Sequence, residues 1–424
     1  MFGSDKLISI GTTSNPRIFL SAGEASGDHY GAEIITELRR RLPGATFTGL
    51  GGTAMEAAGQ HRIVRAEEVA HMGLTEVLRH ALYIHSQYRA LVRAVRHSPP
   101  ALAILIDFPD VNLRLAWHLR RVGVPVLYFV SPQLWAWKRR RLRWVQQRVD
   151  RMLVIFPFEA PFYRARNVNA EFVGHPLATL PLPTISREEY ADAYDIDPET
   201  TWIALLPGSR DSEIERNLPA MLEMAGLLGN DYNFIIPVAS TIKDTTVMKL
   251  IAAGENAIPR WRHLVCVVPD AREALHHARA AIVASGTATV QALTIGNPFV
   301  VVYRVSPLTY AILKRLVRYP AEIPTQPDAD GNLPIAMPNL IAGRRIVPEL
   351  LNQRFTAENL AAALRPLLDE TPARRQMIAD LAEARVKLLP TPDSNPIRRV
   401  CEAAEDLLRP TTPTEVPRTP VANV

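Results

Sequence analysis

The chain has 424 residues, of which 47% are hydrophobic and 21% are charged. This composition is typical of globular proteins and argues against a disordered chain. The length predicts two or three domains, and we expect two. Two cysteines are too few for a disulfide framework or a cysteine-based metal site. No apolar run approaches the roughly 20 residues of a membrane span, and the polar N-terminus has no signal-like stretch, so we expect a cytoplasmic protein.

Strands alternate with helices along the first half of the chain. Arg17–Ala22 reads as a strand that turns through the glycines of SAGEASGD into a helix. Further strands are expected at 46–50, 102–106, 126–129, 152–155 and 171–173, and helices at 32–41, 83–96 and 113–122. Such alternation predicts a parallel, doubly wound sheet.

The same alternation restarts after a proline-rich connection that follows residue 176. Its strands are expected at 202–206, 234–237, 264–268, 281–284 and 299–302. The predicted fold class is therefore α/β, with two Rossmann-like domains facing a cleft, where ligands lie beyond the carboxyl ends of the strands. The expected segments are a first domain (1–176), a second domain (177–390), a helix that packs back on the first domain (391–409) and a disordered tail (410–424).

Two turns in the second half are candidates for binding a diphosphate. The stretch 280–303 reads as strand, small-residue loop, helix and strand, and its loop is Ser285-Gly286-Thr287. Free amides and the positive end of the helix dipole suit an anion there, although an ordinary structural crossover has the same pattern. In the turn LLPGSR, Arg210 could add a charge-assisted hydrogen bond to phosphate.

Carboxylates follow two strands of the first half. Asp107 stands at the carboxyl end of a buried strand, where partial desolvation can raise its pKa and make it a general base. Capping of the next helix is the alternative, and we expect that role for Asp110. Glu24 and Asp28 in the glycine turn are further acid–base or sugar-binding candidates, although carboxylates at a helix start also stabilise the helix.

Aromatic and basic residues interleave between Ser131 and Asp150. Three of the six tryptophans lie there among six lysines and arginines, with no acid before Asp150. This pattern suits an anionic membrane surface. Nucleic-acid binding, or a solvated basic helix whose tryptophans pack inward, would look similar.

Two Asp-x-Asp pairs, Asp195/Asp197 and Asp328/Asp330, could in principle hold a divalent metal. Neither follows an apolar strand, and both lie in proline-bordered loops. They are therefore expected to form turns, and the sequence predicts no metal site.

Many segments together resemble one family in the same order, the lipid-A-disaccharide synthases. They are SAGEASGD, IDFPDVN, SPQLWAW, FPFEAPFY, FVGHPLA, LLPGSRDSE, SGTAT, YRVSPLTY and PNLIAGRRIVPELL. The resemblance implies a metal-independent, inverting glycosyltransferase of the B type that needs no cofactor. It would transfer 2,3-diacylglucosamine from a UDP-linked donor to 2,3-diacylglucosamine 1-phosphate, giving a β-1,6-linked disaccharide 1-phosphate and UDP. It would work at the inner membrane as a peripheral monomer or homodimer, without nucleic acid.

The resemblance also assigns residues. Asp107 would act as the base, with Glu24 and Asp28 nearby. The expected UDP-binding residues are Gly208, Ser209, Arg210, Ser285, Gly286, Thr287, Thr289, Gln291, Asn339 and Glu349. The expected membrane- or acyl-facing residues are Met72, Leu74, Trp135, Trp137, Lys138, Arg139, Arg140, Arg141, Arg143 and Trp144.

Three departures from the family pattern stand out. Gln291 replaces a usual glutamate, Glu322–Ala336 resembles an insertion, and the likeness fades after Leu368. Two other classes remain open. Another UDP-sugar enzyme of this fold, such as a murein glycosyltransferase or an epimerase, would keep the nucleotide loops but lack the remaining motifs. A non-catalytic UDP or lipid carrier would tolerate loss of Asp107.

Overall fold

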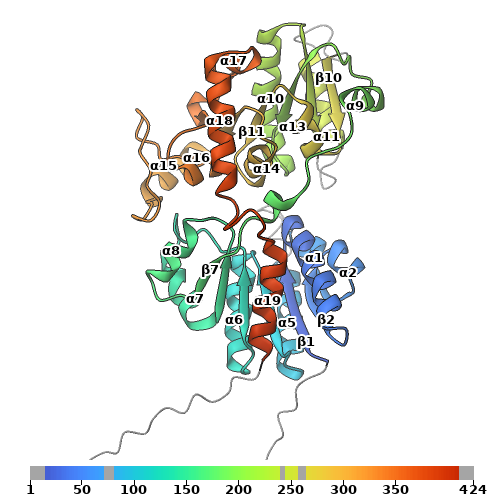
Figure 1. Cartoon of the computed structure of the whole chain (residues 1–424), viewed down its shortest axis with the longest axis vertical. Coiled ribbons are helices and arrows are strands. Elements are labelled where there is room, and N and C mark those ends of the chain that lie inside the picture. Colours follow the sequence, from blue (N-terminus) through green and yellow to red (C-terminus); the bar gives the residue numbers. More distant parts are fainter. Residues whose placement is uncertain (1–14, 71–80, 239–243, 256–263, 410–424) are drawn as a thin grey trace, which may run out of the picture.

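The computed structural model describes residues 15–70, 81–238, 244–255 and 264–409. It contains two sheets, one for each half of the chain (Figure 1). The predicted Met72, Leu74 and the tail 410–424 lie outside the described residues. Within the described part, no helix is both long enough and apolar enough to cross a membrane.

The first sheet has seven strands in the order β3-β2-β1-β4-β5-β6-β7, all paired in parallel. Its strands are β1 (Arg17–Ala22), β2 (Thr46–Gly51), β3 (Gln60–Arg65), β4 (Leu102–Ile106), β5 (Val126–Phe129), β6 (Arg151–Val154) and β7 (Ala170–Phe172). Its helices are α1 (Ala25–Arg41), α2 (Thr53–Ala57), α3 (Glu67–Ala70), α5 (Ala81–His97), α6 (Pro109–Arg121), α7 (Leu142–Arg148) and α8 (Glu159–Arg164).

The second sheet has six parallel strands in the order β10-β9-β8-β11-β12-β13. They are β8 (Thr201–Leu206), β9 (Tyr232–Pro237), β10 (Val265–Val268), β11 (Ala280–Ala284), β12 (Phe299–Tyr303) and β13 (Glu349–Leu351). The helices are α9 (Arg187–Tyr194), α10 (Asp211–Leu228), α11 (Asp244–Glu255), α13 (Ala271–His277), α14 (Thr287–Ile295), α15 (Pro307–Leu316), α16 (Met337–Ala342), α17 (Ala357–Leu368) and α18 (Pro372–Val386). The chain then continues into α19 (Pro396–Leu408), which packs on the first sheet.

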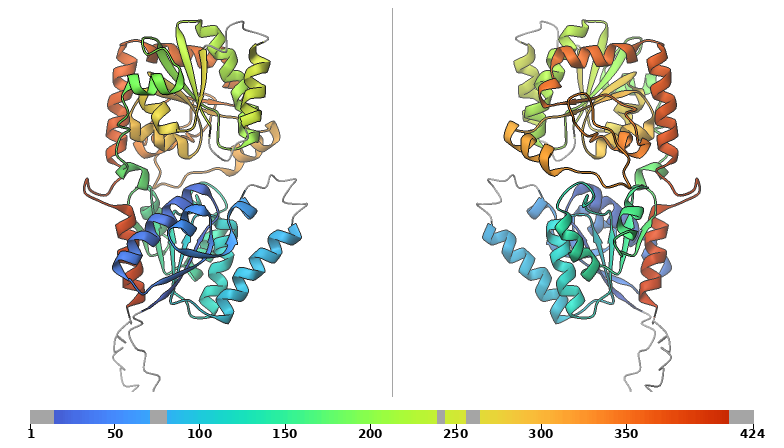
Figure 2. Two further views of the ribbon diagram at one scale, coloured as in Figure 1. Left: turned by 90° about the vertical axis from the view of Figure 1, so that its right-hand side faces the viewer. Right: turned by 90° about the vertical axis from the view of Figure 1, so that its left-hand side faces the viewer.

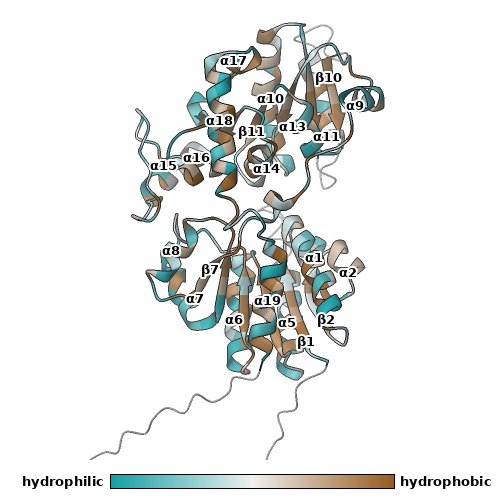
Figure 3. Ribbon diagram, in the orientation of Figure 1, coloured by the Kyte–Doolittle hydropathy of each residue, from teal (hydrophilic) through white to brown (hydrophobic). Residues whose placement is uncertain are grey.

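Helices cover both faces of each sheet (Figure 2). On the first sheet, α1, α2 and α19 pack together on one face, and α5, α6 and α7 on the other. The central strands consist mostly of apolar residues, as Figure 3 shows, because both of their faces are covered. The predicted fold class, two doubly wound α/β domains, is confirmed.

Two strands, β3 and β13, were not predicted from the sequence, and both lie at a sheet edge. β3 reads QHRIVR, with mostly polar residues, because an edge strand is only partly covered. β13 has three residues and gives too short a pattern to recognise.

The last helix, α19, returns to the first domain after the chain has crossed between the domains a second time. It packs against α1, β4 and β5. Its buried face includes Ile397, Val400 and Cys401. Where the two crossings meet, the His175 N–H donates to the Leu388 carbonyl at 2.8 Å. Residues at the far end of the chain therefore complete the core of the first domain.

The substitution Val400→Ala tests this packing. It removes two buried methyl groups, so we expect a loss of about 1.5–3 kcal/mol in the free energy of unfolding, measured by urea denaturation. Arg398→Ala on the exposed face of the same helix should stay within about 0.5 kcal/mol of the parent. Equal effects of the two changes would contradict the packing of α19 described above.

Candidate active site

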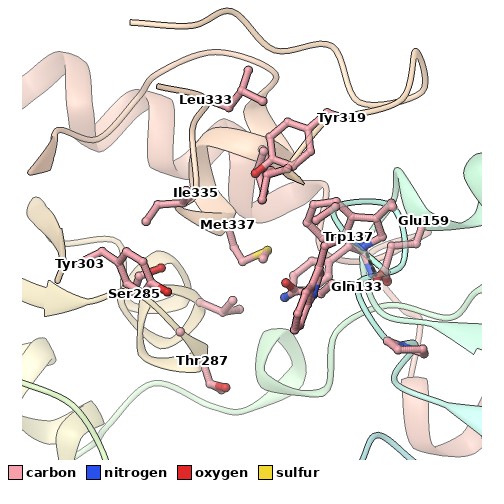
Figure 4. Close-up of a pocket in the computed structure, with 18 of the residues that line it drawn as sticks. Gln133, Trp137, Glu159, Ser285, Thr287, Tyr303, Tyr319, Leu333, Ile335 and Met337 are labelled. Atoms are coloured by element: carbon pink, nitrogen blue, oxygen red, sulfur yellow. Dashed lines mark hydrogen bonds between the residues drawn. The ribbon is translucent and has the colours of Figure 1, made fainter. Parts of the chain in front are cut away.

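A cavity of about 890 Å³ lies between the two domains. Its first wall comes from the loops that follow β1, β4, β5 and β6, and its second wall from the loops that follow β11 and β12 and from the segment leading into α16 (Figure 4). The carboxyl ends of both parallel sheets therefore meet at one place, as expected for a doubly wound fold.

Asp107 lies on the first wall, directly after β4. Its backbone and that of Phe108 are left-handed, with φ of 44° and 49°. The amide of Asn112 and the hydroxyl of Tyr128 both donate to the Asp107 carbonyl, at 2.7 and 2.6 Å. These contacts hold a backbone conformation that costs a non-glycine residue about 1–3 kcal/mol, and they fix the point on the wall from which the side chain projects.

The proton affinity of Asp107 is shifted by its surroundings. Burial at the cavity wall, assisted by the negative charge of Glu24, raises its pKa to about 7, although the Phe108 N–H acts in the opposite direction. Such a pKa suits a general base that works near neutral pH.

Glu24 faces the second domain. It lines the cavity, and its Oε1 lies 3.7 Å from Nη2 of Arg210 in an ion pair between the domains. The Arg210 side chain is 64% exposed, so it has room to move. The rest of its turn is tied to its own helix, since the Ser209 N–H donates to Glu213 and Gly208 has a φ of 138°. None of these three turn residues lines the cavity wall itself.

The loop Ser285-Gly286-Thr287 lines the cavity at the start of α14. Gly286 has a φ of 154°, and a Cβ added there would meet nothing within 4 Å, so its side of the loop is open. Thr289 is buried, and its hydroxyl donates to the Gly286 carbonyl at 2.8 Å. This hydrogen bond stabilises the loop on its buried side. A helix start with this open approach suits an anion.

Asp28 does not reach the cavity wall. Its carboxylate accepts the backbone N–H groups of Gly52, Ala54 and Met55 at 2.7–3.1 Å, at the start of α2. The carboxylate is engaged with free amides of a helix end and is buried, so the structure gives it a stabilising role. We therefore do not retain it among the acid–base candidates.

Asn339 and Glu349 lie behind the second wall and do not line it. Glu349 Oε1 accepts from the amide of Asn339 and from the N–H groups of Ile335 and Ala336, at 2.7–3.0 Å. Both side chains are buried. They support the cavity-lining segment. Gln291 is half-buried and also lies outside the wall.

The tryptophan–arginine segment differs from the expected membrane-facing surface. Trp135 is 1% exposed, since its indole N–H donates to the buried Glu159 and its ring contacts Tyr319 of the second domain. Trp144 is half-buried beneath Arg148. Trp137 is 41% exposed and carries Lys138 over its ring at 4.1 Å.

The basic residues of this segment are mostly accessible. Those with exposed side chains are Lys138, Arg139, Arg140 and Arg143. Arg139 also donates to the Arg318 carbonyl of the second domain. Arg141 pairs with Asp110. We expected Asp110 to cap α6, but it lies in the first turn of the helix, and Phe108 holds the capping position.

The sequence analysis missed Glu159, a carboxyl group buried at the first wall. It accepts from the Ser131 hydroxyl, the Trp135 indole and the Phe156 N–H, at 2.7–3.1 Å. Burial raises its pKa to about 7, against the effect of these hydrogen bonds. The motif FPFEAPFY contains this residue, but its apolar neighbours alone do not show that it turns inward.

Segment 322–336, which resembles an insertion, takes part in the cavity. Pro327 and Leu333 line the cavity, and Glu322 pairs with Arg166 of the first domain at 2.8 Å. The segment therefore covers one side of the cleft and joins the two domains.

Comparison with known proteins identifies the family. The model of the lipid-A-disaccharide synthetase family matches residues 18–394. The lipid-A-disaccharide synthase of Acidobacterium capsulatum is 53% identical over 404 residues, which cover 94% of this chain and 98% of that protein. The chain belongs to the lipid-A-disaccharide synthase family. The synthase of Koribacter versatilis is 44% identical over 373 residues, covering 88% of this chain and 93% of the relative.

Solved structures share the fold at low identity. The calicheamicin glycosyltransferase CalG4 matches with a TM-score of 0.57 and 14% identity, over 93% of this chain and 98% of that one. A UDP-GlcNAc 2-epimerase from Neisseria meningitidis, bound to UDP-GlcNAc, matches with a TM-score of 0.56 and 11% identity, over 92% and 99%. The predicted family, its glycosyltransferase activity in lipid A synthesis and the GT-B fold are confirmed.

The substitution Glu159→Gln tests the buried carboxyl group. A carboxyl whose pKa rises on folding, here from 4.5 to about 7, favours the folded state below pH 4.5, and that contribution is lost as the pH rises through 7. Between pH 4.5 and 8 the wild type should therefore lose up to about 3 kcal/mol more unfolding free energy than the variant. Parallel stability curves from urea denaturation would show that the pKa of Glu159 is not raised.

Proposed function

We propose that this chain transfers 2,3-diacylglucosamine from UDP-2,3-diacylglucosamine to 2,3-diacylglucosamine 1-phosphate, with Asp107 as the base. The main support is the arrangement of the cavity. A carboxylate with a pKa of about 7 stands on one wall, and an open helix start stands on the other. One group suits a sugar hydroxyl and the other suits a diphosphate.

The transfer would follow a single displacement. Asp107 accepts the proton of the acceptor 6-hydroxyl while that oxygen forms a bond to the anomeric carbon of the donor. The bond between this carbon and the diphosphate oxygen breaks on the opposite face, and UDP leaves with the electron pair. The anomeric configuration inverts, and Asp107 ends the step protonated.

Negative charge develops on the diphosphate as UDP leaves. The amides at the start of α14 would receive it, and Arg210 would move from Glu24 to the phosphate, since their ion pair is 3.7 Å long and well exposed. The helix start and Arg210 would then balance the charge of the leaving group, and the reaction would need no added metal ion.

We also infer that the protein works at the cytoplasmic face of the inner membrane, because both substrates carry acyl chains. Exposed basic groups at Lys138, Arg140 and Arg143, beside the exposed ring of Trp137, suit an anionic lipid surface.

The decisive assay is formation of the disaccharide 1-phosphate, measured by mass spectrometry without added metal. Wild type should form it, and Asp107→Asn should be slower by at least about 100-fold, because the amide cannot accept the proton. The matched control is Asp110→Asn in the same motif, which is exposed and should stay within a few-fold of the wild type. Equal rates for Asp107→Asn and the wild type would remove Asp107 from its role.

The pH dependence gives a second test. Because the base must be ionised, kcat/KM of the wild type should fall tenfold per pH unit below about 7. Glu24→Gln removes a negative charge that raises the pKa of Asp107, so in this variant the fall in kcat/KM should begin at a lower pH. A fall that begins at the same pH as in the wild type would show that Glu24 does not act on the base.

Vesicle flotation tests the membrane surface. Reversing the charge of Lys138, Arg140 and Arg143 to Glu should lower binding to anionic vesicles by at least about tenfold, since each basic group near such a surface contributes about 1 kcal/mol. The control reverses Arg375, Arg385 and Arg398, which are exposed on α18 and α19. Equal losses in both variants would indicate a net-charge effect and contradict the assigned surface.

A further inference from the structure

One wall of the cavity presents a row of apolar side chains. Leu333, Ile335 and Met337 are half-buried and line the cavity, while the residues between them are buried away from it. This alternation is that of an extended chain, which rises about 3.3 Å per residue, so the row spans roughly 13 Å.

The row is held in place from behind. Glu349 accepts the N–H groups of Ile335 and Ala336, and the Tyr319 hydroxyl donates to the Pro334 carbonyl at 2.7 Å. Its apolar face is therefore fixed before any ligand arrives.

The opposite side contributes an aromatic ring. Trp137 reaches into the cavity from the first domain and lies across from Met337 in Figure 4, beside the polar Gln133. The start of α14 lies near the same end of the row in this view. In the view of Figure 4, Ile335 and Met337 lie nearer than Leu333 to Ser285 and Thr287.

This combination does not match a polar ligand alone. A nucleoside diphosphate and a sugar ring would bind at the α14 loop, but their polar groups would not explain why three apolar side chains in a row are exposed to the cavity. Burying such side chains is favourable, at about 25 cal/mol per Å². A ligand with an anionic group at one end and a hydrocarbon chain at the other would cover both parts.

We propose that one acyl chain of the UDP-linked donor lies along Leu333, Ile335 and Met337, between this row and Trp137. The row belongs to the same domain as the α14 loop, which is why we assign the chain to the donor. The inference rests on the function proposed above. It makes this row a determinant of acyl-chain length.

The substitution Leu333→Trp tests the site by filling its far end. We would measure kcat/KM for short-chain and long-chain UDP-diacylglucosamines in mixed micelles, with the same acceptor. The ratio of long-chain to short-chain activity should fall at least about tenfold, as expected if about two methylene groups lose their contacts. Leu227→Trp, an exposed position on α10, is the control and should keep the wild-type ratio.

A second variant, Leu333→Asn, keeps the branching and the number of side-chain heavy atoms and should lower the same ratio by loss of apolar contact. UDP binding by calorimetry should stay unchanged in both variants, which also reports that they fold. An unchanged ratio with normal UDP binding would place the acyl chain elsewhere. Weaker UDP binding, with equal losses for both donors, would assign the row to the nucleotide. Absence of product from the wild type with every donor would instead reject the proposed function itself.

Discussion

The arrangement of the cavity depends on the backbone at the end of β4, where two consecutive non-glycine residues, Asp107 and Phe108, adopt left-handed conformations. Hydrogen bonds from Asn112 and Tyr128 offset the cost of this conformation. Asn112 is itself fixed, since its amide oxygen accepts the Ser21 hydroxyl of β1 at 2.6 Å. Two central strands and one helix thus cooperate to hold a single carboxylate at the cavity wall, where desolvation raises its pKa.

The same principle recurs at two other parts of the cavity wall, each of which is held by a buried carboxyl group behind it. Glu159 fixes the loop that carries Ser131 and Trp135, and Glu349 fixes the segment that carries the apolar row. The two domains meet through Arg166 and Glu322 and through the contact of Trp135 with Tyr319. A movement of one domain against the other would therefore change the wall that we assign to the donor.

Local sequence pattern predicted the fold well, because buried parallel strands leave continuous apolar runs and the turns between them leave glycine and proline. It failed at the edge strands β3 and β13, whose side chains face solvent or whose length is too short. In the site, the position of a residue at a strand end placed Asp107 and Ser285 on the cavity wall. Which way Asp28 and Trp135 point depends on partners 24 residues away in the chain, and Glu349 turns inward because folding brings the N–H groups of Ile335 and Ala336 to it. No local pattern contains that information. The role of Asp107 as the base stays a prediction.

The most direct measurement is the pKa of Asp107 in the folded protein. Carboxyl-labelled aspartate, followed by carbon NMR during a pH titration and compared with Asp107→Asn, isolates the signal of this one group. We expect a midpoint of about 7, set by burial and by the charge of Glu24. A midpoint near 4, the ordinary value for aspartate, would show that the carboxyl is well solvated and would contradict the assignment of Asp107 as a base tuned by the cavity.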